Sequence, residues 1–333
     1  MLPGSGPTDS AGCRFFLNER MNRISYSRLT ERRKRVAIKN KYIFLLKLAL
    51  PALFFIVLGY EAKGMLSKLD WDASAGLARS LSFLDLLYIF ALGIAALSPM
   101  YFYDVVLLQM FSVHIPKTKL FFYSLSANAY SNIVGLGGIA GATLRTYFYK
   151  KYLPKDSPLV LTAAKLSFFF LTGLSLFAIA VLTNSAGPLD GWESVPLWAI
   201  ALYNPLFLAL YWHRKPFWDI PGNRKGFVSE LVAISIFEWL FIVLCIWGIS
   251  HTIGVNISFF QLFPIVIIAL CTGIISMIPG GAGSFDLIFL LMMQREGVAG
   301  EAAMLILFLY RLSYYLFPVL LGTPFIVKKI LGK

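Results

Sequence analysis

Two apolar segments of this chain are each interrupted by a glycine-rich tract that is followed by an ionisable residue. The first tract reads NIVGLGGIAGATLR over residues 132–145, and the second reads IPGGAGSFD over residues 278–286. Glycine runs and Pro-Gly pairs unwind helices, which frees backbone amides and carbonyls from their internal partners. In a bilayer such a break is tolerated only where it is buried in protein or lines a watery cavity. Paired interrupted segments are also the best sequence pointer to the substrate site of a membrane transporter. The tracts therefore indicate a chain that moves a charged or amphiphilic molecule.

The composition is typical of a membrane protein. Hydrophobic residues make up 58% of the chain and charged residues only 14%, whereas soluble domains carry about 25% charged residues. Several apolar runs reach the roughly 20 residues that a helix needs to cross a bilayer. These runs are continuous rather than alternating, which argues against a β-barrel. The predicted fold class is an all-α polytopic membrane protein.

Positive charge is concentrated at the N-terminus. Residues 1–47 contain 11 Lys and Arg against three acids, and the whole chain carries a net charge of +13. The run ERRKR at 31–35 precedes the first apolar segment, which is typical of a cytoplasmic signal that orients the chain and contacts anionic headgroups. We therefore predict a basic, partly disordered cytoplasmic arm over 1–40 and a transmembrane domain over 41–330. Nucleic-acid binding is the weaker interpretation of so short an arm, and no nucleic-acid partner is expected.

Hydropathy and the placement of Lys and Arg predict about six full spans. They cover residues 42–62, 84–113, 158–183, 195–212, 228–252 and 302–326. The second span is expected to bend at Ser98-Pro99. The two broken segments, 120–149 and 259–294, are expected to be re-entrant helical hairpins that enter from opposite faces, because the positive-inside pattern fails downstream if either one crosses. Both termini then lie in the cytoplasm.

Five charged residues lie within the apolar segments. Each needs a partner, water or a function, since a charge at membrane depth costs at least ~2.5–3.5 kcal/mol. One interpretation makes them ion pairs that lock helices together, and the other makes them a transport site. Asp104 and Arg145 flank an irregular backbone segment and therefore favour the transport-site interpretation. Arg311 is placed near the start of a span, where both interpretations stay open. The candidates are Asp104, Arg145, Glu238, Asp286 and Arg311.

The glycines of the two tracts complete the candidate site. Small residues permit close helix packing, and this explains isolated glycines such as Gly93 and Gly173. Four glycines fall within seven positions of the first tract, which favours freed amides that bind phosphate. The aromatic clusters at 101–103, 147–149 and 314–315 are expected to lie at the membrane interfaces, and lining a lipid path is the weaker interpretation. The candidate glycines are Gly135, Gly137, Gly138, Gly141, Gly280, Gly281 and Gly283.

The sequence contains no recognisable catalytic constellation. Ser, His and Asp do not cluster, no HExxH motif occurs, and the glycine tracts lack the lysine and flanking strand of a P-loop. The three cysteines, Cys13, Cys245 and Cys271, have neither metal-site nor disulfide spacing. We therefore expect no catalytic residue, no metal and no cofactor in this chain.

Four segments resemble the N-terminal transmembrane domain of the lysylphosphatidylglycerol synthase/flippase family, the bacterial multiple peptide resistance factors. The resemblance covers roughly residues 40–330. The segments are SPMYFYD at 98–104, GLGGIAGATLR at 135–145, PGGAGSFD at 279–286 and LYRLSYYLFP at 309–318, in the order of the family.

The resemblance implies a lipid flippase of the bacterial cytoplasmic membrane. In that family, aminoacylated phosphatidylglycerol, such as lysyl-phosphatidylglycerol, is made on the cytoplasmic leaflet and moved to the outer leaflet. The less negative outer surface then repels cationic antimicrobial peptides. By position within the motifs, Asp104, Arg145 and Asp286 match charged residues that are implicated in flipping, and Glu238 matches more loosely.

Other functions remain open at this point. Full-length family members continue into further spans and a cytoplasmic aminoacyl-tRNA-dependent transferase domain, whereas this chain stops at Lys333. The chain is thus expected to be a stand-alone relative or part of a bifunctional protein. It could serve as the membrane component of a phosphatidylglycerol lysyltransferase that needs a separate aminoacyltransferase domain. It could also be a scaffold or channel-like protein, or a secondary transporter of another lipid or a solute. A homo-oligomer is open as well.

Overall fold

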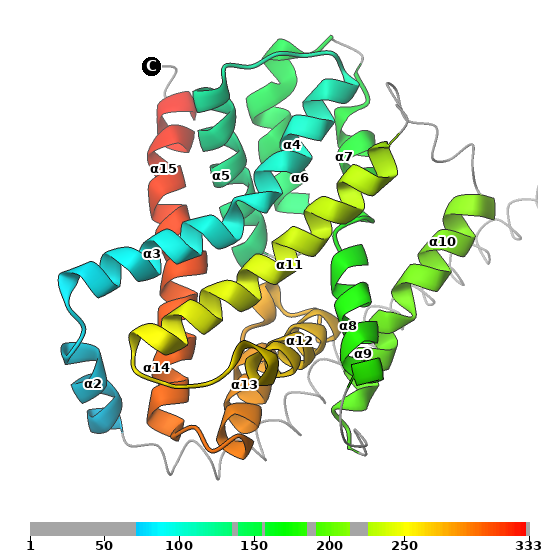
Figure 1. The fold of residues 1–333 in the computed structure, drawn as a ribbon. Helices are drawn as coiled ribbons and strands as arrows, with labels where there is room; N and C mark the ends of the chain where they lie inside the picture. The colour runs from blue at the N-terminus through cyan, green and yellow to red at the C-terminus, as the bar shows by residue number, and fades with distance from the viewer. Residues whose placement is uncertain (1–70, 135–138, 155–156, 185–190, 214–225, 331–333) are drawn as a thin grey trace, which may run out of the picture. The chain divides into compact units, whose positions relative to one another are not determined.

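The computed structural model describes residues 71–134, 139–154, 157–184, 191–213 and 226–330, all of which belong to the unit Val57–Lys333. Within these ranges the chain is helical, without strands (Figure 1), so the predicted all-α class is confirmed. The helices are α2 (Trp71–Arg79), α3 (Phe83–Leu97), α4 (Pro99–Met110), α5 (Lys117–Val134), α6 (Ile139–Tyr149), η2 (Lys150–Tyr152), α7 (Leu159–Ser167), α8 (Thr172–Asn184), α9 (Ser194–Ala201), α10 (Tyr203–His213), α11 (Phe227–Thr252), α12 (Phe259–Ile275), η4 (Pro279–Gly281), α13 (Ser284–Arg295), α14 (Gly300–Tyr310), η5 (Arg311–Leu316) and α15 (Phe317–Ile330).

Five helical segments in the described ranges are long and apolar enough to cross a membrane. They cover Phe83–Met110, Leu159–Asn184, Ser194–His213, Phe227–Thr252 and Gly300–Val327. Each agrees to within about three residues with a span predicted from hydropathy. The predicted first span, 42–62, and the basic arm lie outside the described residues.

The second predicted span bends where the sequence indicates. Helix α3 ends at Leu97, and α4 begins at Pro99, which occupies the first helical position. Proline is suited to that position because it lacks the N–H that a helix start leaves unpaired. The other end of α3 is fixed by a capping box, in which Ser82 accepts a hydrogen bond from the Asp85 amide and Asp85 accepts one from the Ser82 amide. The bend directs α4 toward the candidate site.

Isolated glycines bring helices into close contact. A Cβ atom built on Gly93 would collide with the Ser313 carbonyl group, so the backbones of α3 and η5 are in direct contact at this point. At Gly173 the same construction meets the Ser235 carbonyl oxygen at 2.5 Å, where α8 packs against α11. The Gly173 amide also donates to the Ser235 hydroxyl at 2.8 Å. The packing role expected for these two glycines is therefore confirmed.

The two glycine-broken segments form two helix pairs that contact each other. Helix α5 packs against α6, α12 packs against α13, and η4 in the second break packs against α5. A Cβ atom on Gly280 would lie 3.5 Å from the Asn132 carbonyl oxygen, near the end of α5. The tetrapeptide 135–138 of the first break lies outside the described residues. The second break therefore meets the end of the helix that leads into the first.

The start of α5 lies beside the end of α15. The rings of Phe122 and Phe325 stack with centroids 4.0 Å apart. In Figure 1 the α4–α5 connection and the C-terminal end of α15 both lie at the upper edge, and the α13–α14 connection lies at the lower edge. The α4–α5 connection and the end of α15 therefore occur at the same end of the unit.

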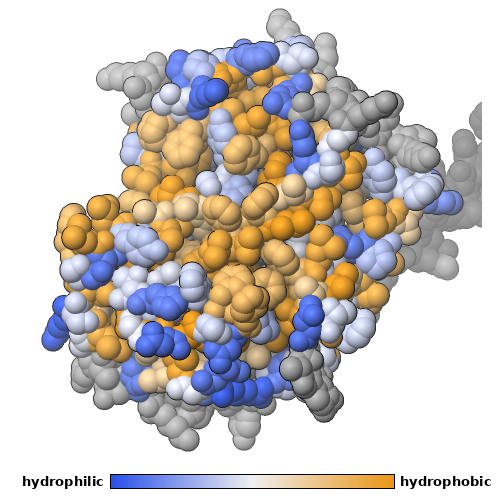
Figure 2. All heavy atoms as spheres, viewed as in Figure 1, coloured by the Kyte–Doolittle hydropathy of each residue, from blue (hydrophilic) through white to orange (hydrophobic). Residues whose placement is uncertain are grey.

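Large apolar side chains are exposed on many of the helices, including Phe83, Phe102, Leu206 and Phe260. Figure 2 shows apolar residues across the middle of one face, over α3 and α11, and hydrophilic residues toward its upper and lower edges. Such a band suits contact with lipid. The chain is thus a polytopic membrane protein.

The expectation that the aromatic clusters lie at the membrane interfaces was wrong for half of their members. The side chains of Tyr103, Phe148, Tyr149 and Tyr314 are buried in the protein core. Phe148, for example, stacks on Tyr123 with ring centroids 4.6 Å apart. Contacts between helices bury these aromatic side chains, although hydropathy alone places them at the membrane interfaces. Several of these rings surround the candidate site.

Candidate functional site

The first part of the candidate site is a buried ion pair between α4 and α6. Arg145 Nε donates to Asp104 Oδ1 at 2.7 Å, and Arg145 Nη2 donates to Asp104 Oδ2 at 3.4 Å. Asp104 is 0% exposed and Arg145 is 7% exposed. An ion pair this deeply buried is stable only when further hydrogen bonds satisfy its remaining atoms.

Helix α5 supplies those hydrogen bonds. Ser124 donates to Asp104 Oδ2 at 2.6 Å, and Asn128 Oδ1 accepts from Arg145 Nη2 at 2.5 Å. Asn128 Nδ2 in turn donates to the Ser124 hydroxyl at 3.0 Å. Ser124 and Asn128 are four residues apart and so share one face of the helix. An i, i+4 polar pair in an apolar helix is a signal that is visible in the sequence, yet neither residue was among the predicted site residues.

Gly141 has a packing role in this cluster. A Cβ atom there would lie 2.9 Å from Arg145 Nη1 and 2.9 Å from the Ser131 side chain. Because Gly141 and Arg145 are four residues apart on α6, the missing side chain leaves space for the guanidinium. Gly135, Gly137 and Gly138 lie outside the described residues, so their predicted role as phosphate ligands stays a prediction.

Glu238 on α11 lies near this cluster without a salt bridge of its own among the described residues. The residue is 5% exposed, and its carboxyl group interacts electrostatically with Arg145 and Tyr103. Three buried oxygens make no hydrogen bond of ordinary geometry in the described part of the chain, namely Glu238 Oε2, the Tyr103 hydroxyl and the Tyr149 hydroxyl, although the Tyr103 hydroxyl lies close enough to Glu238 to interact with it. Buried polar atoms are normally paired, and an unpaired one is costly. The unpaired oxygens therefore mark a place that can accept or donate further hydrogen bonds.

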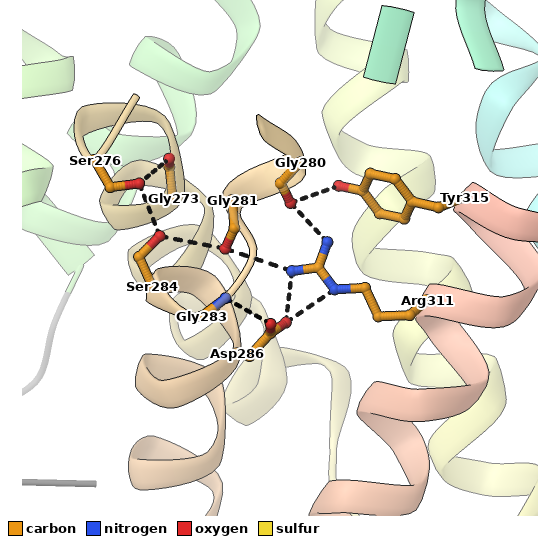
Figure 3. Close-up of polar contacts among 9 residues, drawn as sticks. All are labelled: Gly273, Ser276, Gly280, Gly281, Gly283, Ser284, Asp286, Arg311 and Tyr315. Carbon is orange, nitrogen blue, oxygen red and sulfur yellow. Dashed lines mark hydrogen bonds and ion pairs between the residues drawn. The ribbon is translucent and has the colours of Figure 1, made fainter. Parts of the chain in front are cut away.

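The second part of the site holds Arg311 against the second glycine tract (Figure 3). Arg311 Nε and Nη2 both donate to Asp286 Oδ1, at 2.9 and 2.5 Å, and Arg311 Nη1 donates to the Gly280 carbonyl at 2.6 Å. The Tyr315 hydroxyl also donates to that carbonyl, at 3.3 Å. Arg311 was predicted near the start of a span, but it lies midway along Gly300–Val327, in the π-helical segment η5. A π-helical turn often occurs at a functional site.

The backbone of this tract has the conformation that its glycines permit. The φ angles of Gly280, Gly281 and Gly283 are +63°, +62° and +85°, in a region that side chains with a Cβ rarely adopt. The turn exposes the carbonyls of Gly280 and Gly281 to Arg311. The Gly283 amide donates to Asp286 Oδ2 at 2.8 Å at the start of α13. The predicted break in the helix is confirmed at this position.

The two ion pairs differ in how far they are exposed. The side chains of Arg311 and Asp286 are 23% and 25% exposed, whereas those of Arg145 and Asp104 are 8% and 0% exposed. Helix α5 links them, because Asn128 bonds to Arg145 and Asn132, one turn later, has its backbone carbonyl beside Gly280. The Asn132 Nδ2 also donates to the Tyr314 hydroxyl at 3.2 Å. The structure therefore brings the predicted charges together as two separate pairs, Asp104–Arg145 and Asp286–Arg311, with Glu238 near the first.

Similarity to known proteins identifies the family of this chain. The family described as the lysylphosphatidylglycerol synthase TM region matches residues 44–322. The chain belongs to this family. The match includes both glycine tracts and all five charged candidates, so the family resemblance noted from the motifs is confirmed.

The relatives of this family member include much longer proteins. It is 33% identical over 297 residues to the phosphatidylglycerol lysyltransferase of Bacillus subtilis, and the match covers 86% of this chain and 35% of that protein. It is 31% identical over 290 residues to the protein of the same name from Staphylococcus haemolyticus, with 86% of this chain and 34% of that protein covered. The chain thus spans about a third of the length of the curated relatives it matches.

Proposed function

We propose that this protein is a lipid flippase that moves aminoacylated phosphatidylglycerol, such as lysyl-phosphatidylglycerol, from the inner to the outer leaflet of the bacterial cytoplasmic membrane. The observation that carries the proposal is the pairing of Arg145 with Asp104, between α4 and the helices that flank the first glycine tract, and of Arg311 with Asp286 at the second glycine break, which contacts α5. A lipid headgroup with a phosphate and an amine needs both signs of charge within the membrane. Outward movement of such a lipid would reduce the negative surface charge that attracts cationic antimicrobial peptides.

In this proposal the arginines bind the lipid phosphate. A phosphate is a bidentate partner for a guanidinium, as a carboxylate is. Arg145 is already bonded to Asp104 and Asn128, so the phosphate must exchange with the Asp104 carboxylate. The ammonium of the headgroup would be attracted by Glu238, whose Oε2 has no partner among the described residues. The phosphate would take the place of the Asp104 carboxylate at Arg145, and the ammonium would lie beside Glu238. The charges of the site and the headgroup would then stay balanced.

The membrane arrangement is also a proposal. The pairs α5–α6 and α12–α13 would be re-entrant hairpins that enter from opposite faces, and both chain termini would be cytoplasmic. The meeting of η4 with the end of α5 supports this arrangement, because hairpins from opposite faces meet near the middle of the bilayer. Half-helix ends at that depth are typical of substrate sites in transporters.

The test is lipid movement in liposomes that contain the purified protein. Lysyl-phosphatidylglycerol that reaches the outer leaflet is measured with an amine reagent that cannot cross the membrane, and phosphatidylglycerol with a headgroup label is measured in parallel. We expect Arg145→Gln and Glu238→Gln to abolish movement of the lysyl lipid while the protein remains folded and inserted. A matched control is the double variant Glu193→Gln/Arg295→Gln, which removes an ion pair that joins α13 to the start of α9 and is not part of the site. Wild-type rates in the site variants would refute the proposal.

A second candidate function comes from the names of the relatives. Since the matched proteins are called phosphatidylglycerol lysyltransferases, this chain could instead be the membrane component that presents lipid to a separate aminoacyltransferase domain. Such a component would raise the yield of lysyl-phosphatidylglycerol when it is reconstituted with that domain and lysyl-tRNA. It would not move the finished lipid between leaflets in the liposome assay.

A further inference from the structure

Glu238 is a buried carboxyl group without a counter-charge of its own. It lies midway along α11, is 5% exposed and forms no salt bridge with any described residue. Arg145 interacts with it electrostatically, but the Arg145 guanidinium already donates to the Asp104 carboxylate at 2.7 Å. Two acidic groups therefore share a single basic one in this part of the site.

The polar side chains beside Glu238 on α11 have other partners. The Ser235 hydroxyl and the Trp239 indole both donate to the Phe170 carbonyl, at 2.8 and 2.7 Å. Phe170 lies in the interruption between α7 and α8, where a backbone carbonyl lacks its helical partner. Glu238 Oε2 makes no hydrogen bond of ordinary geometry in the described part of the chain. This oxygen can therefore hold a proton or accept a hydrogen bond from a cationic donor.

The titratable groups that face Glu238 come from three other elements. They are Tyr103 on α4, Arg145 on α6 and Tyr314 in η5. Of the other elements packed against α11, α8 and α12 contain no charged residue, and α3 and α14 contain one acid each, in their first turns. The tetrapeptide at 135–138, which is outside the described residues, reads GLGG and contains no titratable side chain. Among the described residues, Arg145 is thus the one basic group that faces Glu238.

The charges of this cluster favour a protonated Glu238 when the site is empty. Asp104 and Arg145 cancel each other, so an ionised Glu238 would leave one unbalanced negative charge among buried residues. Such a charge is costly because it has lost its hydration. A proton on Glu238 removes that cost without any further residue.

The cargo of the proposed function brings the opposite charge. Lysyl-phosphatidylglycerol has one phosphate and two ammonium groups, so it carries one net positive charge. Bound beside a protonated Glu238, it would leave that charge unbalanced within the membrane. Loss of the Glu238 proton would make the occupied site neutral again.

We propose that Glu238 is a proton-binding site and that the protein exchanges one proton for each lysyl-phosphatidylglycerol that it moves. When a headgroup ammonium approaches from the inner leaflet, the Glu238 O–H bond breaks, the proton passes to water on the cytoplasmic side, and the carboxylate pairs with the ammonium. When the lipid leaves for the outer leaflet, the carboxylate takes up a proton from outside. This inference rests on the proposed function, because it supplies the driving force for movement of the same cargo.

The first measurement is proton release on binding. The full chain in detergent micelles is titrated with lysyl-phosphatidylglycerol at about pH 6, where both lipid amines hold their protons. A pH-indicator dye in weakly buffered solution counts the protons, and the bound lipid is measured in parallel. We expect about one proton for each lipid bound. Phosphatidylglycerol, which has no ammonium group, should release none.

The second measurement is the distribution of the lipid between the leaflets of liposomes that contain the protein. A pH gradient of about one unit, acid outside, should enrich lysyl-phosphatidylglycerol about tenfold in the outer leaflet at equilibrium. A potassium diffusion potential should leave the distribution unchanged, because the exchange moves no net charge. Movement of the cationic lipid alone would instead respond about 50-fold to a potential of about 100 mV.

Three variants assign the proton to a residue. Glu238→Gln should release no proton for each lipid bound, because an amide does not titrate in this range. Glu238→Asp keeps a carboxyl group on a shorter side chain and should retain the release. The matched control is Glu296→Gln, which removes an exposed carboxyl group at the end of α13 and should release protons as the wild type does. Because release is counted per bound lipid, a loss of affinity cannot imitate a loss of the proton.

Three results would overturn the inference. They are binding of lysyl-phosphatidylglycerol by the wild type without proton release, equal release from Glu238→Gln, and a lipid distribution that follows the membrane potential and not the pH gradient. The exchange and the proposed function can fail independently. Lipid movement without proton release refutes only the exchange, whereas Glu238-dependent proton release without lipid movement refutes the flippase and leaves Glu238 as a proton-binding site.

Discussion

The Asp104–Arg145 pair allows a test that separates stability from transport, because a double variant should regain stability without regaining lipid movement. Replacing Arg145 with Gln removes both hydrogen bonds to Asp104, at 2.7 and 3.4 Å, and leaves a carboxylate that is 0% exposed without a counter-charge. Breaking a buried pair from one side costs about 3–5 kcal/mol, because the remaining charge stays buried. Asp104→Asn should cost a similar amount, since it leaves the Arg145 guanidinium buried instead.

The double variant Asp104→Asn/Arg145→Gln should recover much of that loss. Both side chains are then neutral and can still bond to Ser124 and Asn128 on α5. Removing a buried pair as a whole is often close to neutral, so we expect a cost of no more than about 2 kcal/mol. The coupling between the two sites would then exceed about 3 kcal/mol, within the range measured for close charge pairs. In the Glu193–Arg295 pair, the Arg295 side chain is 57% exposed. We therefore expect a coupling of about 1 kcal/mol or less between these two residues.

The assay is reversible unfolding in mixed micelles, followed by tryptophan fluorescence for the wild type, both single variants and the double variant. The same four proteins are then tested for lipid movement in liposomes. A flippase should lose movement in all three variants, including the stable double variant, because the charges themselves bind the lipid. If the double variant is as unstable as the sum of the two single variants, the account of the buried pair is wrong. If it moves lipid at the wild-type rate, the charges are structural and the site assignment is wrong.

Three further predictions concern glycine packing and the unpaired carboxylate. Gly93→Ala should strongly destabilise the protein in the same unfolding assay, because its Cβ would collide with the Ser313 carbonyl group; stability within about 0.5 kcal/mol of the wild type would contradict this packing. Gly280→Ala should lower the free energy of unfolding by about 1–2 kcal/mol, because φ is +63° at this position. The matched control is Gly76→Ala in α2, where no atom lies within 4 Å of the new Cβ, and it should be neutral or stabilising. Glu238→Gln should leave unfolding stability unchanged or higher, since it keeps the size of a buried side chain that has no salt bridge among the described residues, and it should abolish lipid movement; a loss of stability with normal movement would show a structural role.

The spans could be predicted because their signal is local. A continuous apolar run of about 20 residues must be helical in a bilayer, whatever its neighbours are. The bend at Ser98-Pro99 and the break at Gly280 follow in the same way from the backbone chemistry of proline and glycine. The predicted re-entrant geometry depends on the position of the bilayer and stays a prediction.

The partners of the charges could not be predicted from the sequence. Asp104 and Arg145 are 41 positions apart, and Asp286 and Arg311 are 25 apart. Hydropathy singles out all four residues without pairing them, because charge type alone does not say which carboxylate an arginine meets. The predicted site also lacked Ser124 and Asn128, whose hydrogen bonds complete the first pair, although their spacing on one helix face is visible in the sequence.

By itself, the sequence determined that this chain is a helical membrane protein with two broken segments and a small number of charges within the bilayer. These properties follow from the cost of exposing polar backbone or charge to lipid, which acts residue by residue. Only the tertiary structure decided that Tyr103, Phe148 and Tyr149 are in the core, that the second break meets the end of α5, and that Glu238 lies near an ion pair without joining it. Those outcomes depend on how closely whole helices approach, and Gly93 and Gly173 set that distance through contacts with residues far away in the sequence.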